Sequence, residues 1–141
     1  MSENDFILDV SVTLAWCFAD EVSPVGESAL GALETGTAHC PAVWPLEVGN
    51  ALLGAERRGR VSEAEIVRFL ELLWGLAVEV ESSSPSTVFG EVLRLARDQG
   101  LSTYDASYLD LAMRYALPLA TLDTQLREAA RWCGVSLLGP Q

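Results

Sequence analysis

Four carboxylate side chains are the main candidates for chemistry, because each lies at the end of a predicted strand or near the start of a predicted helix. They are Asp9, Glu47, Asp105 and Asp123. In a parallel sheet covered by helices, ligands bind beyond the carboxyl ends of the strands, where such residues meet. Several carboxylates there would repel one another unless a cation lies between them. Oxygen ligands alone favour Mg²⁺ or Mn²⁺, which activate a bound water and hold a phosphoryl group.

Each of these carboxylates also has an ordinary structural explanation. Asp9 and Asp123 could cap the helices that follow them, and Glu47 could be a solvated acid favoured by a helix dipole. Asp105 is the most informative, because it falls on the apolar face of its helix, where an acid without a partner costs free energy. Its alternative is a capping box, in which its side chain reaches back to the backbone of Ser102.

The composition excludes most other kinds of catalytic site. The 141 residues include 20 acidic and 9 basic side chains, for a net charge of −11, and every basic side chain is an arginine. Without lysine there is no P-loop, Schiff-base or lysine-base chemistry, and no G-x-G-x-x-G follows a predicted strand. The single histidine, His39, lies in an apolar, strand-like stretch, where we expect a structural role. Zinc is disfavoured with one histidine and no C-x-x-C pair, so metal-activated water is the best-supported nucleophile.

The elements that must position these residues alternate along the chain. Strands are predicted at residues 6–9, 38–43, 77–80, 119–122 and 135–138. Helices are predicted at residues 11–19, 23–33, 45–58, 62–75, 84–100, 102–116 and 124–132. Because the apolar runs lack polar alternation and are separated by helices, they predict an α/β fold, with a central parallel sheet in three α/β/α layers. We expect one domain over residues 1–141.

The remaining features predict a soluble protein of a reducing compartment. Three widely spaced cysteines are expected to be free and buried: Cys17, Cys40 and Cys133. The acidic residues 1–5 lack signal-peptide features and no apolar run reaches the length of a membrane span, so we expect a cytoplasmic location. Four tryptophans are expected in the core or in a dimer interface: Trp16, Trp44, Trp74 and Trp132.

The segments around the four acids resemble the four motifs of PIN-domain nucleases. They are residues 6–12, 45–52, 101–108 and 120–123 with Leu126, and their order and spacing fit the family over about residues 5–138. Each motif is short, but four in order are fairly specific. The length of the chain is similar to that of the VapC toxins of toxin–antitoxin pairs.

The resemblance implies a PIN-like fold and a Mg²⁺- or Mn²⁺-dependent endoribonuclease. The four acids would hold the metal, and water would attack the RNA phosphodiester in line, leaving a 5′-phosphate and a 3′-hydroxyl. Three residues match positions that commonly support the site: Ser11, Asn50 and Thr121. Members of the family usually form homodimers. A cognate antitoxin inhibits them; its C-terminal segment wraps the toxin and can place a basic residue in the acidic pocket.

RNA binding must be local, because affinity for nucleic acid comes largely from neutralising phosphates and this chain is acidic. Arg57, Arg58 and Arg60 cluster at the end of the Glu47 helix, and Arg58 lies on the Glu47 face, roughly 16 Å along at about 1.5 Å per residue. These arginines are candidate phosphate contacts. They could equally be solvated side chains favoured by the helix dipole.

Other charged side chains are expected to be solvated. The polar face of the helix at residues 102–116 is made by three residues: Ser107, Asp110 and Arg114. Asp110 is therefore predicted to be an ordinary solvated acid. Arg94 and Arg97 are expected on a solvated helix face, from which they could add phosphate contacts.

Two other functions fit the sequence. One is a different metal-dependent phosphohydrolase on a similar frame, such as a phosphatase. A haloacid-dehalogenase-type enzyme would need an Asp-x-Asp motif and a lysine, whereas the chain has Asp9-Val10-Ser11 and no lysine. The other is a catalytically degenerate PIN-fold binding module. The presence of all four acids argues against it.

Overall fold

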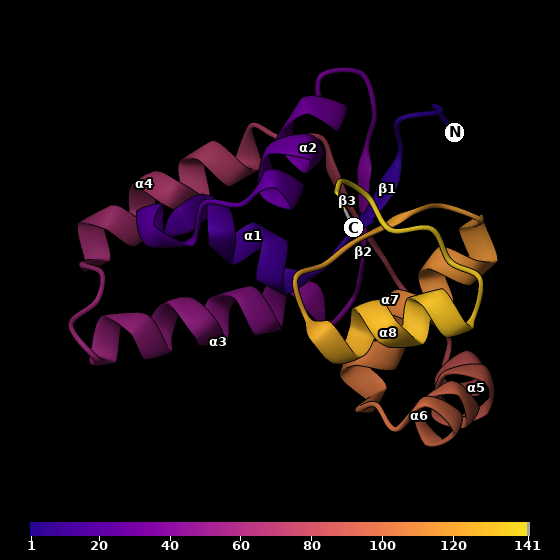
Figure 1. The fold of residues 1–141 in the computed structure, drawn as a ribbon. Helices are drawn as coiled ribbons and strands as arrows, with labels where there is room; N and C mark the ends of the chain where they lie inside the picture. Colours follow the sequence, from indigo (N-terminus) through magenta and orange to yellow (C-terminus); the bar gives the residue numbers. More distant parts are fainter. Residues whose placement is uncertain (141) are drawn as a thin grey trace.

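A sheet of four parallel strands forms the centre of the computed structural model, which describes residues 1–140 (Figure 1). The strands are β1 (Phe6–Leu8), β2 (Ala38–Pro41), β3 (Val78–Glu81) and β4 (Leu119–Ala120), in the order β3-β2-β1-β4. Every residue of β1, β2 and β4 is buried, as apolar strands are when helices cover both faces of a sheet. The predicted parallel sheet is confirmed.

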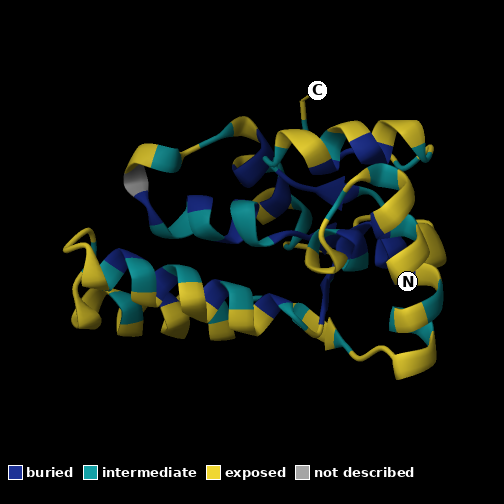
Figure 2. Ribbon diagram, turned by 90° about the horizontal axis from the view of Figure 1, so that it is seen from below, coloured by how far each residue is buried: buried dark blue, intermediate teal, exposed yellow. Residues whose placement is uncertain are grey.

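Two groups of helices lie on either side of this sheet. The first comprises α1 (Val10–Cys17), η1 (Ala19–Glu21), α2 (Pro24–Ala32), α3 (Trp44–Arg57) and α4 (Glu63–Trp74). The second comprises α5 (Pro85–Thr87), the π-helical turn η2 (Val88–Val92), α6 (Leu93–Gln99), α7 (Thr103–Tyr115) and α8 (Thr124–Trp132). Figure 2 shows that the helices carry buried and exposed stripes, as helices do when one face packs on a core. The sheet between the two helical groups (Figure 1) confirms the predicted three layers. Among residues 1–140, no helix combines the length and apolarity needed to cross a bilayer.

The chain reverses its direction across the sheet between β1 and β4. The connections from β1 to β2 and from β2 to β3 step toward one edge, and the connection from β3 returns to place β4 beyond β1. In such sheets a ligand crevice lies outside the carboxyl ends of the two strands where the direction reverses. Asp9 directly follows β1 and Thr121 directly follows β4, so both residues lie at this crevice.

Local sequence signals explain several helix ends. Ser62 and Glu65 form the predicted capping box at the start of α4, with reciprocal backbone-to-side-chain hydrogen bonds of 3.1 and 3.0 Å. Gly100 ends α6 at a φ of +66°, a left-handed conformation that glycine adopts without a Cβ clash. Ala116 ends α7 at a φ of +53°, where a residue with a Cβ loses roughly 1–2 kcal/mol.

The strand predicted at residues 119–122 is shorter in the structure. The N–H of Leu122 donates to the Ser11 hydroxyl at 2.9 Å, and the N–H of Asp123 donates to the Thr121 hydroxyl at 3.0 Å. Side-chain hydroxyls therefore take the backbone groups that would continue the sheet ladder. The strand ends where the candidate site begins.

Two further elements differ from their predictions. The strand predicted at residues 135–138 is a single bridge between Leu119 and Leu137, because the neighbouring Pro118 and Pro140 have no N–H to extend a ladder. The helix predicted at residues 84–100 contains the π-helical turn η2 between α5 and α6. Such turns occur inside longer helices without ending them.

The predicted burial of the tryptophans and cysteines is correct only in part. Trp44 is buried and Trp16 is half-buried, but Trp74 and Trp132 are 87% and 83% exposed. A core placement is therefore wrong for the last two, which end α4 and α8. The cysteines are free, one buried and two half-buried: Cys40, then Cys17 and Cys133.

Candidate active site

The carboxylate of Asp9 lies in a hydrogen-bond network across the carboxyl ends of β1 and β4. It is 2% exposed, and its Oδ2 accepts hydrogen bonds from the hydroxyls of Ser11 at 2.6 Å and Thr121 at 2.7 Å. Burial raises the pKa of Asp9 and these bonds lower it, with a net shift upward. Asp9 occupies the N-cap position of α1 without capping it through its side chain. The two hydroxyls instead hold the carboxylate toward the crevice between the strands.

Asp123 caps α8, as its structural alternative predicts. Its Oδ1 accepts a hydrogen bond from the N–H of Leu126 at 2.9 Å. Its own N–H donates to the hydroxyl of Thr121, which donates in turn to Asp9. Because a carboxylate has two oxygens and several acceptor positions, capping does not prevent Asp123 from binding a cation.

Glu47 lies in the first turn of α3 and is held by a residue of the opposite helical layer. The hydroxyl of Tyr108 on α7 donates to Glu47 Oε1 at 2.7 Å. Burial raises the pKa of Glu47, the Tyr108 bond lowers it, and the charges of Asp9 and Asp105 raise it further. By its helical position Tyr108 belongs to the apolar face of α7, and this pattern alone does not indicate a role at the site. The signal that could have found it is that a buried tyrosine hydroxyl needs a partner.

Asp105 has no partner for its carboxylate. Its N–H donates to Ser102 Oγ at 3.0 Å, which is one half of the predicted capping box. Within the described residues 1–140, its carboxylate accepts no hydrogen bond and forms no ion pair. Burial raises the pKa of Asp105, and the charges of Asp9 and Asp123 raise it further. A half-buried acid in such surroundings is costly unless a cation or a donor approaches it.

The four predicted acids therefore lie within electrostatic reach of one another. Asp9 interacts with Glu47 and Asp105, and Asp105 also interacts with Glu47 and Asp123. Among the described residues, no three of these carboxylates bring oxygens within 4.8 Å of one another. This spacing suits a hard ion such as Mg²⁺, which usually bonds one or two protein carboxylates and keeps several waters. The donor set, all oxygen and strongly negative, fits a divalent cation of this kind.

Comparison with known proteins places the chain in a family. The model of the PIN domain matches residues 6–131, which include all four acids. The chain belongs to the PIN domain family. It is also similar to Ribonuclease VapC3 of Pyrobaculum aerophilum, with 32% identity over 122 residues, covering 86% of this chain and 92% of the relative. This PIN domain is therefore of the VapC type.

Two further matches from the same organism support the assignment. Exonuclease VapC9 is 40% identical over 80 residues, 57% of each chain. The crystal structure of PAE2754 has a TM-score of 0.68 and 30% identity, covering 89% of this chain and 85% of that one. One relative is named a ribonuclease and another an exonuclease.

Asn50 and Arg60, a candidate supporting residue and a candidate RNA-binding residue of the PIN domain, have different surroundings. Asn50 is exposed on α3, and its side chain forms no hydrogen bond within residues 1–140. Arg60 is engaged, because its Nη2 lies 2.8 Å from Asp20 Oδ1 and 2.9 Å from Glu21 Oε2. The Arg60 guanidinium also lies 4.0 Å from the centre of the Phe18 ring.

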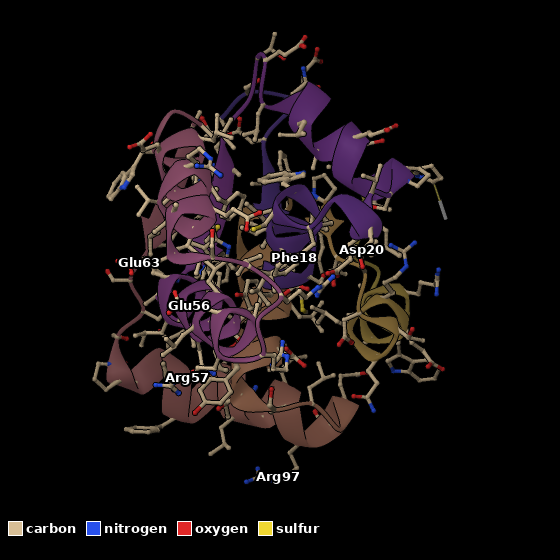
Figure 3. All side chains as sticks on the ribbon, turned by 90° about the vertical axis from the view of Figure 1, so that its left-hand side faces the viewer. Phe18, Asp20, Glu56, Arg57, Glu63 and Arg97 are labelled. Carbon is tan, nitrogen blue, oxygen red and sulfur yellow. The ribbon has the colours of Figure 1, made fainter. Side chains whose placement is uncertain are left out.

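Two of the candidate RNA-binding arginines remain open to a ligand. Arg57 and Arg58 are exposed at the end of α3. Figure 3 shows Arg57 on α3, while Arg97 projects from the lower edge of the molecule on α6. Arg57 and Arg97 therefore belong to separate surfaces.

The prediction of a solvated Asp110 is wrong. Asp110 is 6% exposed, and its Oδ2 accepts a hydrogen bond from Arg114 Nε at 2.9 Å. The helical pattern assigned one face of α7 to the sheet and the other to water. In the structure α7 also packs against η2, α6 and α8, so its second face is covered as well.

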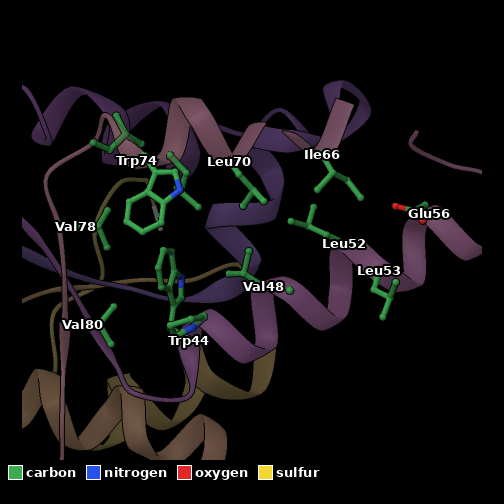
Figure 4. A pocket seen from close by; sticks show the side chains of 14 residues that line it. Trp44, Val48, Leu52, Leu53, Glu56, Ile66, Leu70, Trp74, Val78 and Val80 are labelled. Carbon is green, nitrogen blue, oxygen red and sulfur yellow. The ribbon is translucent and has the colours of Figure 1, made fainter. Parts of the chain in front are cut away.

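An apolar groove of about 580 Å³ lies between α3, α4 and β3. Figure 4 shows the rings of Trp44 and Trp74 on its two sides and Glu56 at its outer end. None of the four predicted acids lines this groove. It is therefore separate from the candidate active site.

Proposed function

We propose that this PIN domain is a Mg²⁺- or Mn²⁺-dependent endoribonuclease that acts as the toxin of a toxin–antitoxin pair. The observation that carries this proposal is Asp105, whose half-buried carboxylate lacks a partner among residues 1–140 and is coupled to Asp9 and Asp123. A carboxylate in this position fits the role of a cation ligand. The names of the VapC relatives support ribonuclease chemistry.

The four acids would hold the ion, and neighbouring side chains would keep them in place. Ser11 and Thr121 orient Asp9, and Tyr108 orients Glu47. Partners of this kind fix the donor oxygens before substrate binds. When bound, the ion supplies a water of lowered pKa and neutralises charge on the phosphodiester.

RNA would lie across the rim of the crevice, with phosphates near Arg57 and Arg58. In-line attack by water would leave a 5′-phosphate and a 3′-hydroxyl. Because the chain carries a net charge of −11, we expect weak, salt-sensitive binding in which local shape provides selectivity. Asn50, exposed on the Glu47 helix, would contact the substrate or its bound water.

The decisive test is a cleavage assay on structured RNA with Mn²⁺. Asp9→Asn and Asp105→Asn should each abolish cleavage while circular dichroism shows a folded protein. Asp98→Asn, an exposed acid on α6, is the matched control and should retain full activity. If the folded Asp9→Asn and Asp105→Asn variants cleave RNA as fast as the natural protein, the mechanism is overturned.

The same assay separates the alternatives. Internal fragments from end-labelled RNA indicate an endonuclease, whereas mononucleotides released from one end indicate an exonuclease. Hydrolysis of small phosphate esters instead of RNA would favour a general phosphohydrolase. Failure to bind Mn²⁺ at neutral pH would favour a degenerate binding module.

We further propose that the protein forms a homodimer in the cytoplasm and is inhibited by a cognate VapB-like antitoxin. The antitoxin would reach the acidic crevice with a basic residue, for which Asp105 offers an unpaired carboxylate. Light scattering measures the mass of the purified protein and of its complex with the product of a neighbouring small gene. A monomer that no such product inhibits would contradict this part of the proposal.

A further inference from the structure

His39 lies at a second cluster of charged side chains, which includes none of the four acids. It is on β2 and 5% exposed. Its Nδ1 lies 2.9 Å from Glu81 Oε1 and 3.8 Å from Glu79 Oε2, and its Nε2 lies 3.1 Å from Asp5 Oδ2. The parallel register pairs His39 with Glu79 on the edge strand β3. Glu81 follows two residues later and thus projects from the same face.

Asp5 fixes which nitrogen of His39 carries a proton. Asp5 is buried and also accepts a hydrogen bond from the N–H of Thr37 at 2.9 Å. Its carboxylate accepts a hydrogen bond from Nε2 of His39, whose side chain is the only one that reaches it among residues 1–140. In neutral histidine the other nitrogen, Nδ1, then presents a lone pair to two glutamates. A lone pair facing carboxylates is unfavourable unless a proton or a metal ion lies between them.

This arrangement is recurrent in metal proteins: one nitrogen of a histidine donates to a carboxylate, and the other nitrogen faces the metal and its further ligands. Metal-binding histidines usually donate their second N–H to a carboxylate or carbonyl, which sets the tautomer and orients the ring. Here Asp5 takes that position, and the ring is further fixed by an edge-on contact with Tyr115 at 5.6 Å. The Nδ1 atom and one oxygen each from Glu79 and Glu81 all lie within 4.8 Å of one another.

We propose that His39, Glu79 and Glu81 bind a zinc ion, as a second metal site distinct from the acidic crevice. One imidazole and two carboxylates form a three-ligand set that zinc accepts, with water as the fourth ligand. A divalent ion also offsets the three carboxylates of Asp5, Glu79 and Glu81 better than a single proton on His39 does. Glu79, whose side chain is 66% exposed, gives the ion a route from solvent.

Such an ion would be structural. It would connect the edge strand β3 to β2 and, through Asp5, to the segment that enters β1. None of the four acids of the candidate active site is among these ligands, so occupation should raise stability without being needed for cleavage. The sequence disfavours zinc because it has one histidine and no C-x-x-C pair, and it does not reveal that the β2–β3 register brings two glutamates beside His39.

Calorimetric titration with Zn²⁺ tests the proposal in the Asp9→Asn/Asp105→Asn background, which weakens the acidic crevice. One Zn²⁺ should bind per chain, and Glu79→Gln should weaken that binding by roughly tenfold or more. Glu79→Gln leaves the shorter His39–Glu81 contact in place, so the variant should fold. Glu71→Gln, an exposed glutamate on α4, is the control and should bind as the background protein does.

Replacing Zn²⁺ with Co²⁺ gives an independent test, because Co²⁺ bound by few nitrogen and oxygen ligands absorbs visible light. The same bands should be absent in Glu79→Gln and present in Glu71→Gln. The proposal is overturned if Zn²⁺ does not bind, or if Glu79→Gln binds it as tightly as the control. The second outcome would mean that His39 is held by a shared proton alone.

Discussion

The hydroxyl of Thr121 donates a 2.7 Å hydrogen bond to Asp9 Oδ2 and accepts a 3.0 Å hydrogen bond from the N–H of Asp123. This one side chain, fully buried, links two acids from the ends of β1 and β4. A valine in its place would keep the shape and leave the buried carboxylate of Asp9 and the partly buried N–H of Asp123 each one hydrogen bond short. The loss of such partners costs about 1–3 kcal/mol.

Thr121→Val should therefore lower the free energy of unfolding by about 1–3 kcal/mol and lower kcat/KM for RNA by roughly 10- to 100-fold, because Asp9 loses its orientation. Urea unfolding and initial cleavage rates measure the two effects. Thr121→Ser restores the hydroxyl and should recover most of the activity. If the serine variant behaves like the valine variant, the hydroxyl is not what Thr121 contributes.

Tyr108→Phe should raise the Mn²⁺ concentration needed for half-maximal activity by roughly tenfold. The substitution removes the donor to Glu47 Oε1 and keeps the buried ring, so the fold should survive. Tyr104→Phe is a matched control one turn earlier on α7, where the side chain is 60% exposed. An unchanged metal requirement in Tyr108→Phe would show that Glu47 does not need this bond.

Residues of the candidate active site could be predicted where the sequence signal lies in the neighbouring residues. Asp9 and Asp123 follow apolar runs, and parallel topology alone brings such strand ends together. The position of Asp105 on an apolar helix face indicated an acid with an unusual environment, and in the structure its carboxylate lies without a partner in residues 1–140.

The sequence-based predictions failed where a residue's surroundings are set by helices or strands that are distant in the sequence. Asp110 looked solvated because a helical pattern does not reveal that α6 and α8 cover the outer face of α7. The partnership of Tyr108 with Glu47 joins residues 61 positions apart, which no spacing rule connects. The His39 cluster depends on the register between β2 and β3, and register is set by tertiary packing rather than by either strand alone.

Asp105→Asn should change stability in opposite directions with and without metal. In EDTA the variant should have a higher Tm than the natural protein, because burial and the charges of Asp9 and Asp123 disfavour an ionised Asp105. With Mg²⁺ the natural protein should gain stability, by about 2.7 kcal/mol at one hundred times its Kd, and the variant should gain less. Calorimetric melting curves in both buffers give the comparison.

Mg²⁺ is the appropriate ion for this experiment because it prefers oxygen ligands and is a poor match for the histidine-containing cluster. Asp98→Asn should follow the natural protein in both buffers. If Asp105→Asn is less stable than the natural protein in EDTA, Asp105 contributes a favourable interaction to the fold. Its assignment as a cation ligand would then lose its main support.

Arg57→Ala/Arg58→Ala should weaken RNA binding and reduce its dependence on salt. Each phosphate contact on single-stranded nucleic acid contributes a slope of about 0.7 in a plot of log affinity against log salt, so loss of both contacts should lower the slope by about 1.4. Fluorescence anisotropy with labelled RNA in the inactive Asp9→Asn background measures the slope. Arg94→Ala/Arg97→Ala removes the same charge from α6, where Figure 3 places Arg97 far from α3. Equal losses in both pairs would indicate an effect of net charge and not a phosphate-binding rim at the end of α3.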